Sequence, residues 1–363
     1  MEEQIDKRKD SHLEICRTRK IEYDTGSGFY DITMVHNALP EMDREEADCS
    51  VEFLGKKLAA PIIISAMSGG TANGGELNRR LSGAAQKGGI AFALGSQRPM
   101  LKDPAKAEHF KVRKFAPDIP IIGNIGAAQL GEYPVKKIQD MVEMVEADAL
   151  AVHLNALQEA IQPEGETKFK GVLERIDKLC AQLPVPVIVK ETGAGISGPV
   201  ARSLFEAGAK FVESSGSGGT SWSKVEYERG GHLPGFKEWG YPAVPAIAEC
   251  ALAGPTIATG GVRCGVSLAK GIALGAKMGG AALPFLQAED PEKEVQQWID
   301  QIRTTMFLTG SKDISQLQNA PLIVLGASAE IMRARGIDPA MYAMRSNRME
   351  KNSKPGGKEN HYF

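Results

Sequence analysis

Short apolar runs separated by amphipathic stretches dominate the chain from about residue 59 to residue 282. Runs of four or five mostly apolar residues are typical of strands buried on both faces of a parallel sheet. The pattern predicts strands at residues 61–64, 90–94, 119–122, 149–152, 185–189, 210–213, 255–258 and 278–282. Apolar residues at helical spacing predict intervening helices at residues 76–86, 134–145, 172–182, 199–206, 244–252 and 266–274.

This alternation of strand and helix predicts an α/β protein whose parallel sheet is covered by helices. Eight strand units fit a closed (β/α)8 TIM barrel better than an open doubly wound sheet. An open sheet of that kind would begin its first helix with Gly-x-Gly-x-x-Gly, and the stretch Ser68-Gly69-Gly70-Thr71 lacks this spacing. We therefore predict a TIM barrel.

Three segments follow from the same pattern. Residues 1–58 lack the alternation and contain a basic cluster in a short helix and two short strands, at 29–35 and about 49–54. We expect this N-terminal extension to pack on the barrel and close its site. Residues 59–345 form the barrel with two added helices, at 290–308 and 327–335, and the polar residues 346–363 are predicted to be a flexible tail.

Composition and charge narrow the class of protein. Of 363 residues, 42% are hydrophobic and 24% are charged, and the net charge of −2 favours neither a nucleic-acid partner nor a membrane surface. The N-terminus is too polar for a signal peptide, and no apolar run approaches the roughly 20 residues that span a bilayer. The five cysteines have no zinc spacing, which predicts free thiols in a cytoplasmic protein.

A polar cluster follows the strand predicted at residues 149–152. It contains one imidazole, two amides and three carboxylates, from His153, Asn155, Gln158, Glu159, Glu164 and Glu166. One interpretation is a solvated loop with a hydrogen-bonded histidine. The other is an active site, and it is favoured because polar or Gly-rich tips follow the other predicted strands as well, at the end of the barrel where active sites lie.

The tips after the seventh and eighth strands are small and rich in glycine. They contain residues 259–263 and 280–282. Barrels of this kind hold phosphate at these two tips, with backbone amides and a helix N-terminus as donors. Gly261 would let the backbone approach such an anion closely, although glycines that only turn the chain are the alternative.

Lys190 is a charged side chain directly after an apolar strand, so the fold would place it at the barrel mouth. A lysine beside the electron-poor end of an isoalloxazine ring stabilises the reduced flavin by charge attraction. The alternative is an ion pair with Glu191 or Glu213. Ser96, Asn124 and Thr220 are compatible polar partners for a flavin, and the phosphate tips favour FMN over a dinucleotide.

Several motifs in order resemble one family, the type 2, FMN-dependent isopentenyl diphosphate isomerases. The resemblance covers about residues 7–345. It rests on Arg8-Lys9-x-x-His12, Ser65-Ala-Met-Ser-Gly-Gly70, Gly95-Ser-Gln-Arg98, His153-Leu-Asn-x-x-Gln-Glu159 with Pro163-Glu-Gly165, Val189-Lys-Glu191, Gly216-x-Gly-Gly-Thr-Ser-Trp222 and Thr259-Gly-Gly-Val-Arg263. The chain departs from the usual pattern at Ser68, Ala243 and Ser267, and Ser267 can still cap its helix.

The resemblance implies a role for each matching position. Its implied substrate-binding residues are Arg8, Lys9, His12, Ser96, Gln97, Arg98, His153, Asn155 and Gln158. Its implied FMN contacts are Ala66, Met67, Ser68, Ser96, Asn124, Lys190, Ser215, Thr220, Gly261, Val262, Arg263, Ala281 and Ala282. Glu159 would bind Mg²⁺, and the implied catalytic residues are His153, Gln158 and Lys190.

The implied reaction is a 1,3-allylic proton shift that interconverts isopentenyl and dimethylallyl diphosphate. Of the polar cluster, Gln158 does not titrate usefully and Glu159 would be committed to the metal. His153 follows the apolar run by one residue and would face the flavin site as a hydrogen-bond partner. Reduced FMN, acting through its N5, is then the expected acid and base, as the resemblance also implies, with NADPH or NADH as its reductant. We also expect a homo-oligomer, either a tetramer or an octamer.

Two other functions fit part of the pattern. An FMN barrel oxidoreductase would need either a His/Arg pair at the substrate or a nucleophilic cysteine near the sixth strand, and residues 214–221 contain no cysteine. A barrel that only binds flavin or phosphate would need neither a metal-binding carboxylate nor the N-terminal basic pair. We therefore expect an enzyme.

Overall fold

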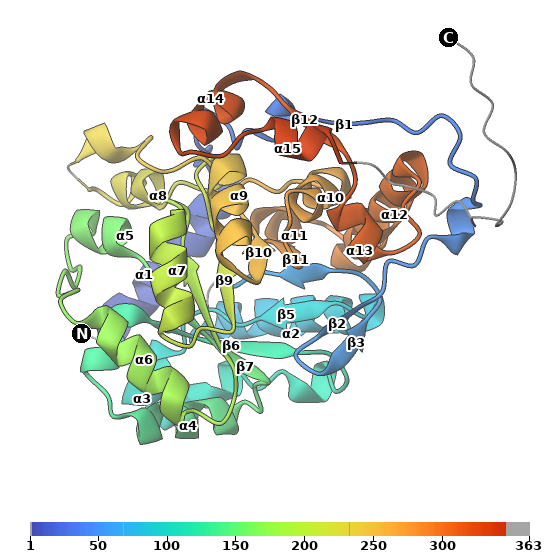
Figure 1. The fold of residues 1–363 in the computed structure, drawn as a ribbon. Coiled ribbons are helices and arrows are strands. Elements are labelled where there is room, and N and C mark those ends of the chain that lie inside the picture. Colours follow the sequence, from blue (N-terminus) through green and yellow to red (C-terminus); the bar gives the residue numbers. More distant parts are fainter. Residues whose placement is uncertain (1, 68, 232, 346–363) are drawn as a thin grey trace, which may run out of the picture.

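A closed barrel of eight parallel strands forms the centre of the computed structural model (Figure 1), which describes residues 2–67, 69–231 and 233–345, with side chains from Lys9 onward. The strand order around the barrel is β10-β11-β4-β5-β6-β7-β8-β9, closing on β10. The strands are β4 (Ile62–Ile64), β5 (Ala91–Ala93), β6 (Ile121–Gly126), β7 (Ala149–Leu154), β8 (Val187–Glu191), β9 (Phe211–Glu213), β10 (Thr256–Ala258) and β11 (Met278–Ala281). The predicted TIM barrel is confirmed.

Three strands extend further toward their C-terminal ends than the apolar runs predict. β6, β7 and β8 include Asn124, His153 and Lys190, because ladder pairing depends on the backbone and continues through polar side chains. His153 therefore lies within β7, paired with Gly126 on one side and Lys190 on the other. Because these polar residues lie within paired strands, ladder hydrogen bonds hold the directions of their side chains more firmly than a loop would.

Helices cover the outside of the barrel close to their predicted positions. They are α2 (Ala72–Gly88), α4 (Val135–Met144), α6 (Val172–Gln182), α7 (Gly198–Glu206), α9 (Ala243–Ala253) and α10 (Gly265–Ala273). α2 begins four residues before its predicted start, because Thr71 Oγ1 caps it by accepting from Gly74 N at 3.1 Å. Gly74 and Gly75 are poor helix formers, but there is little room beside either for a Cβ atom, which would lie within about 3 Å of Gly69 and His109.

Short helices replace the single helix that a regular barrel would place between β5 and β6. They are α3 (Arg98–Lys102) and the 3-10 helices η3 (Pro104–His109) and η4 (Arg113–Phe115). Pro99 and Pro104 stand in the first turns of α3 and η3, where proline costs no hydrogen bond. α3 thus begins at Arg98, directly at the barrel mouth.

The N-terminal extension reaches both ends of the barrel. α1 (Glu2–Thr18) contacts α2, α8 (Trp222–Glu228) and α11 (Leu283–Gln287) near the C-terminal ends of the strands. The hairpin of β2 (Val51–Phe53) and β3 (Lys56–Leu58) lies at the opposite end, where the Phe53 and Phe211 rings pack 5.1 Å apart and Lys56 Nζ lies 2.8 Å from Asp148 Oδ1. The strand predicted at about 49–54 is confirmed, and its partner β3 was not predicted.

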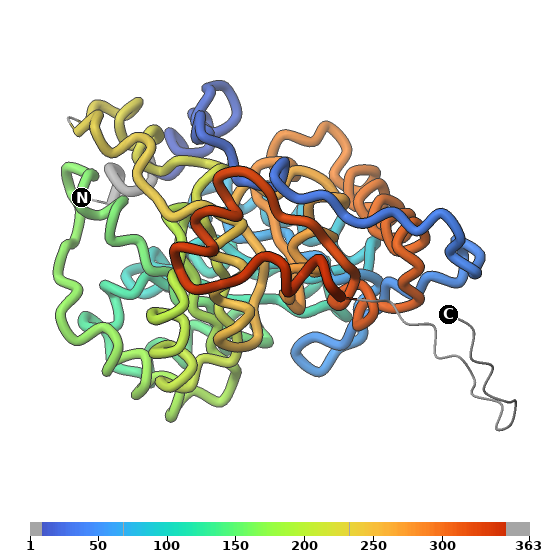
Figure 2. The backbone as a smooth tube through the Cα atoms, turned by 45° about the horizontal axis from the view of Figure 1, so that its top comes forward, coloured from blue at the N-terminus to red at the C-terminus, as the bar shows by residue number. Residues whose placement is uncertain are grey.

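The strand predicted at 29–35 is shorter in the structure and belongs to a separate ribbon. Residues 29–31 form a 3-10 turn, and β1 (Ile32–Met34) pairs antiparallel with β12 (Leu322–Val324) outside the barrel. Figure 2 shows the N-terminal segment running beside the C-terminal helices in this region. β12 was missed because it is three residues long and has no regular pattern around it.

Two further helices after the barrel confirm the predictions at 290–308 and 327–335. α12 (Pro291–Thr309) packs against α2 and α10, and α14 (Gly326–Ala334) packs against α9. α13 (Ile314–Gln318) and α15 (Ala340–Ala343) connect and follow them. No helix in the described ranges is long and apolar enough to cross a membrane. The predicted tail at 346–363 lies outside the described residues.

Candidate active site

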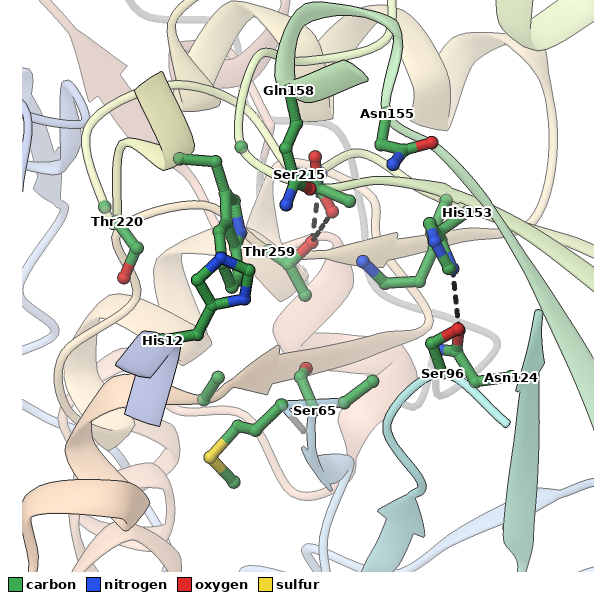
Figure 3. Close-up of a pocket in the computed structure, with 18 of the residues that line it drawn as sticks. His12, Ser65, Ser96, Asn124, His153, Asn155, Gln158, Ser215, Thr220 and Thr259 are labelled. Carbon is green, nitrogen blue, oxygen red and sulfur yellow. Dashed lines mark hydrogen bonds between the residues drawn. The ribbon is translucent and has the colours of Figure 1, made fainter. Parts of the chain in front are cut away.

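One cavity lies at the C-terminal ends of the barrel strands and is roofed by α1, α8 and α11. Side chains from the strand tips and from these helices line it. Figure 3 shows His12 and Thr220 on one side of the cavity, Asn124 and His153 on the other, and Gln158 above. The fold therefore brings residues more than 200 positions apart to a single opening.

His153 is held as a neutral hydrogen-bonding group. Its Nδ1 lies 2.7 Å from the Asn124 side-chain oxygen, so this nitrogen carries the proton. Burial, followed by the charges of Lys190 and Lys9, lowers the pKa of His153 to about 3. The imidazole is therefore uncharged near neutral pH and is poorly suited to act as a cationic acid.

Lys190 lies beside His153 and forms the ion pair that the sequence left as an alternative. Its Nζ is 3.6 Å from Glu213 Oε1 and also donates to the backbone carbonyl of Glu191. Both side chains of the pair line the cavity, so the ion pair does not remove Lys190 from the site. Glu191 turns away and accepts from the amides of Gly193 at 2.6 Å and Gly195 at 3.1 Å.

Loops after β9 and β10 meet in a cradle of glycines. Gly261 has a φ of +67°, and a Cβ atom there would lie 2.6 Å from the Gly218 carbonyl oxygen. A Cβ on Gly219 would lie 2.6 Å from Gly261 N. Thr259 Oγ1 fixes the two loops by accepting from Ser215 N at 3.0 Å.

The donors around the cavity fit a phosphorylated flavin. Backbone amides in the cradle and the Arg263 guanidinium suit a phosphate, and Lys190 lines the same cavity. Ser65 Oγ and Asn155 Oδ1 are buried without a hydrogen-bond partner in the described part of the chain, and both residues line the cavity. Such polar atoms are available to a polar ligand.

The helix α1 delivers two side chains into the same cavity. Lys9 Nζ donates to the carbonyl oxygens of Gly69 and Ser96, the latter at 3.0 Å. His12 Nε2 lies 2.9 Å from Glu226 Oε1, and the His12 ring packs edge-on against Trp222 at 5.1 Å. These contacts attach the N-terminal helix to the barrel mouth.

Glu226 is a buried carboxylate that the sequence analysis did not find. It also accepts from Gln158 Nε2 at 3.2 Å and pairs with Arg229. Burial acts to raise its pKa, but the hydrogen bond and charge of His12 and the charge of Arg229 outweigh burial and lower it. Its spacing of four from Trp222 on one helix face is the sequence signal that could have revealed it.

Glu159 and Arg98 also line the cavity. Glu159 accepts from Asn155 Nδ2 at 2.8 Å and from Glu166 N at 2.6 Å. Arg98 pairs with Glu166, and its Nη2 lies 3.6 Å from Glu132 Oε1. Within the described ranges, no three His, Cys, Asp or Glu side chains are grouped to hold a metal ion.

Most of the predicted site residues that are described line this cavity. They are Lys9, His12, Ala66, Met67, Ser96, Arg98, Asn124, His153, Asn155, Gln158, Glu159, Lys190, Ser215, Thr220, Gly261, Val262, Arg263, Ala281 and Ala282. Ser68 and the side chain of Arg8 lie outside the description. Ser267 Oγ accepts from Arg263 N and Cys264 N, both at 3.1 Å, so it caps α10 as predicted.

Gln97, which was predicted to bind substrate, is not among the described residues that line the cavity. The expectation placed it on the substrate, but its side chain is fully buried beneath the cavity. Its Oε1 accepts from Asn124 N at 2.8 Å, and its Nε2 donates to Met100 Sδ at 3.2 Å. Gln97 therefore supports β6, because the turn into α3 directs its side chain inward.

Other lining residues were not predicted. They include Ser65, Gln129, Gln162, Thr192, Glu213, Trp222, Thr259, Leu283 and Leu286. Thr259 and Trp222 lie in motifs that had been noted, and Glu213 had been considered only as a partner of Lys190. Leu283 and Leu286 have no local signal, because their place in the wall depends on how α11 packs.

The fold and the cavity define a (β/α)8-barrel protein with a cradle of glycines at the C-terminal ends of its strands. A mandelate oxidase structure solved with a monooxide FMN adduct shares this fold, with a TM-score of 0.58 and 14% identity, covering 87% of this chain and 92% of that one. At this identity the likeness concerns the fold alone. No family model matches the chain.

Curated relatives define the family. An isopentenyl-diphosphate delta-isomerase of Methanothrix thermoacetophila is 43% identical over 354 residues, covering 93% of this chain and 98% of the relative. One from Halobacterium salinarum is 45% identical over 350 residues, covering 92% and 97%. The chain belongs to the isopentenyl-diphosphate delta-isomerase family. The resemblance seen in the motifs is confirmed, and the relationship favours an isomerase over the oxidoreductase alternative.

Proposed function

We propose that the protein interconverts isopentenyl diphosphate and dimethylallyl diphosphate, with reduced FMN and Mg²⁺ in the cavity. The observation that carries the proposal is the meeting of three features in one cavity: a glycine cradle, a lysine and a polar cluster ending in Glu159. Such a cavity can hold a phosphorylated ring at its base and an anionic substrate above it.

FMN would lie with its phosphate on residues 261–263 and its ring beside Lys190. Ala66, Met67, Ser96, Asn124, Ser215, Thr220, Ala281 and Ala282 surround the remaining space, and Ser68 is their neighbour in sequence. When bound in its reduced form, FMN supplies at N5 a group that can donate and accept a proton. Lys190 would favour the reduced form by its charge.

The substrate diphosphate would be bound by cations from two directions. Lys9 and Arg98 line the cavity from α1 and α3, and Arg8 precedes Lys9 on the same helix. Glu159 would share a Mg²⁺ ion with the diphosphate, since Mg²⁺ takes one or two carboxylates and completes its shell with water and phosphate oxygens.

The apolar part of the substrate would lie between the ring and Gln158. Glu226 holds the Gln158 amide group, and His12 holds Glu226. Neutral His153 would contribute hydrogen bonds and leave proton transfer to the flavin. We further propose that α1 excludes water from this space, because protonating an unactivated alkene needs a dry site.

The remaining proposals concern the setting of the enzyme. NADPH or NADH would reduce the flavin in a cytoplasmic enzyme, in line with five cysteines that carry no disulfide. A homo-oligomer, either a tetramer or an octamer, is supported by large apolar side chains exposed on the β1–β12 side, including Tyr30, Leu39 and Leu325.

Reconstitution of the purified protein tests the function. We expect it to bind FMN, to be inactive with oxidised FMN, and to isomerise the substrate once dithionite or NAD(P)H reduces the flavin, with no reductant consumed per turnover. A protein that fails to take up FMN would contradict the proposal.

A second comparison locates the proton carrier. 5-Deaza-FMN has carbon at position five and should not support turnover, whereas His153→Ala should keep measurable activity. Normal turnover with the deaza cofactor and a dead His153 variant would instead make the side chain the acid.

A further inference from the structure

Glu213 is the acidic side chain in the cavity that the proposed function leaves without a role. It ends β9, directly opposite Lys190 in the register of β8 and β9. Lys190 in turn lies opposite His153 on β7. Register partners on neighbouring strands project to the same side of a sheet, so the three side chains form one row across the barrel.

The charges in this row cancel. His153 is neutral, Lys190 is a cation and Glu213 is an anion whose Oε1 lies 3.6 Å from the Lys190 ammonium. Both charged side chains are about nine-tenths buried, with exposed fractions of 10% and 9%. In the described part of the chain the Glu213 carboxylate forms its salt bridge with Lys190 alone. Each charge is thus the partner that makes burial of the other tolerable.

We propose that Glu213 is a positioning and charge-balancing residue that sets the reduction potential of bound FMN by offsetting the charge of Lys190. The inference rests on the proposed function, which places the flavin ring beside Lys190. Reduction of the ring by two electrons and one proton leaves a negative charge on it, which an unopposed Lys190 would stabilise strongly. Glu213 weakens that attraction because it lies on the same cation.

The pair would keep the reduction potential of FMN high enough for a cellular nicotinamide to reduce the flavin. It would also keep that potential low enough for the reduction to stay reversible. Lys190 cannot move far from Glu213, because both belong to paired strands and Lys190 Nζ also donates to the Glu191 carbonyl. The balance is therefore built into the barrel and does not depend on the substrate or on α1.

Glu213→Gln tests this role, because it keeps the size of the side chain and removes its charge. The measurement is a dithionite titration of the FMN-loaded variant against a reference dye. We expect the ratio of reduced to oxidised FMN at a fixed potential to rise at least about tenfold, which for a two-electron couple is a shift of about 30 mV to more positive values. An unchanged or more negative potential would overturn the proposal.

Three further variants keep the test interpretable. Glu213→Asp retains the charge and should stay near the wild-type potential, whereas a purely structural role would let it shift as Gln does. Lys190→Met should lower the potential, and Lys190→Met with Glu213→Gln should return toward wild type, because the row is again neutral. A double variant whose potential stays as low as that of Lys190→Met would show that the balance of charge in the row does not set the potential, and would overturn the proposal.

Failure of the two proposals can be told apart. Wild-type protein that binds no FMN contradicts the proposed function before any potential is measured. Wild-type protein that binds FMN and isomerises the substrate, but whose potential ignores the Glu213 charge, contradicts only the present inference. If Glu213→Gln does not fold, Glu213→Asp and Lys190→Met still test the inference. It requires the potential to fall when Lys190 is lost and to stay the same when Asp replaces Glu213.

Discussion

Two groups of side chains meet in the cavity, and they are held there by different means. His153, Lys190 and Glu213 belong to strands, and their directions are set by the ladder hydrogen bonds of the barrel. Lys9 and His12 belong to α1, which packs on the barrel through its side chains, with contacts that include Gly69, Ser96, Trp222 and Glu226. The strand group can support a cofactor that stays in place, and the helix group can release a substrate.

The difference between the groups can be tested because it separates two measurements. Changes in the strand group should alter FMN binding or its potential. Changes in the α1 group should alter the KM for substrate and leave FMN in place.

Glu159→Gln should cause the largest loss. It keeps the shape of the side chain and removes the charge that would bind Mg²⁺, so kcat/KM should fall on the order of 100-fold. Excess Mg²⁺ should restore activity only in part, and FMN content should not change. The measurement is steady-state turnover across a Mg²⁺ series. If this variant behaves like the wild type, the metal ligand would have to be Glu164 or Glu166 instead of Glu159.

Lys9→Ala should raise KM by roughly tenfold or more, because a charge-assisted contact to the diphosphate is lost. Arg8→Ala should act in the same direction. FMN affinity should stay at the wild-type value in both. Lys20→Ala is the matched control. Lys20 lies just beyond the end of α1, and its exposed side chain pairs with Asp24. Loss of FMN together with substrate affinity would show that α1 is a structural support for the barrel.

His153 should make the protein less stable in mild acid. The folded pKa is about 3 and the unfolded value is about 6.5, so between these pH values the unfolded chain binds the extra proton. The free energy of unfolding should therefore fall as pH drops from 6.5, by at most about 1.4 kcal/mol per pH unit from this group. His153→Gln should flatten that decline in urea denaturation at pH 4 to 7. An equally steep decline in the variant would assign it to other groups.

Glu22→Gln should have the smallest effect, and it should strengthen FMN binding, whereas the changes above weaken activity, substrate binding or stability. Glu22 lies between α1 and the cradle, and its carboxylate pairs with Arg263. Removing this competing anion should tighten FMN about threefold, as expected for a partly exposed pair. Riboflavin, which lacks the phosphate, should bind as before, and Asp24→Asn should change neither affinity. If the affinity for riboflavin rises as much as the affinity for FMN, the substitution acts on the flavin ring and not on the phosphate.

The sequence by itself determined the barrel and much of its mouth. Alternating apolar runs can be buried only between layers of helices, so their number and spacing specified the closed parallel sheet. A polar residue directly after such a run must emerge at the mouth, and for this reason His153, Lys190 and Gly261 could be placed from local pattern alone. The motif order then indicated the family that the relatives confirm.

Tertiary structure decided which side chains meet. Glu226 reaches His12 across more than 200 residues, and the burial that makes it important exists only after α1 and α8 pack together. Gln97 follows a strand as the ligand-binding candidates do, but its buried side chain accepts a hydrogen bond from the backbone of Asn124. The sequence offered Lys190 two acidic partners, Glu191 and Glu213, and only the strand register placed Glu213 opposite it. Contacts of this kind depend on packing between distant segments, and no local pattern encodes them.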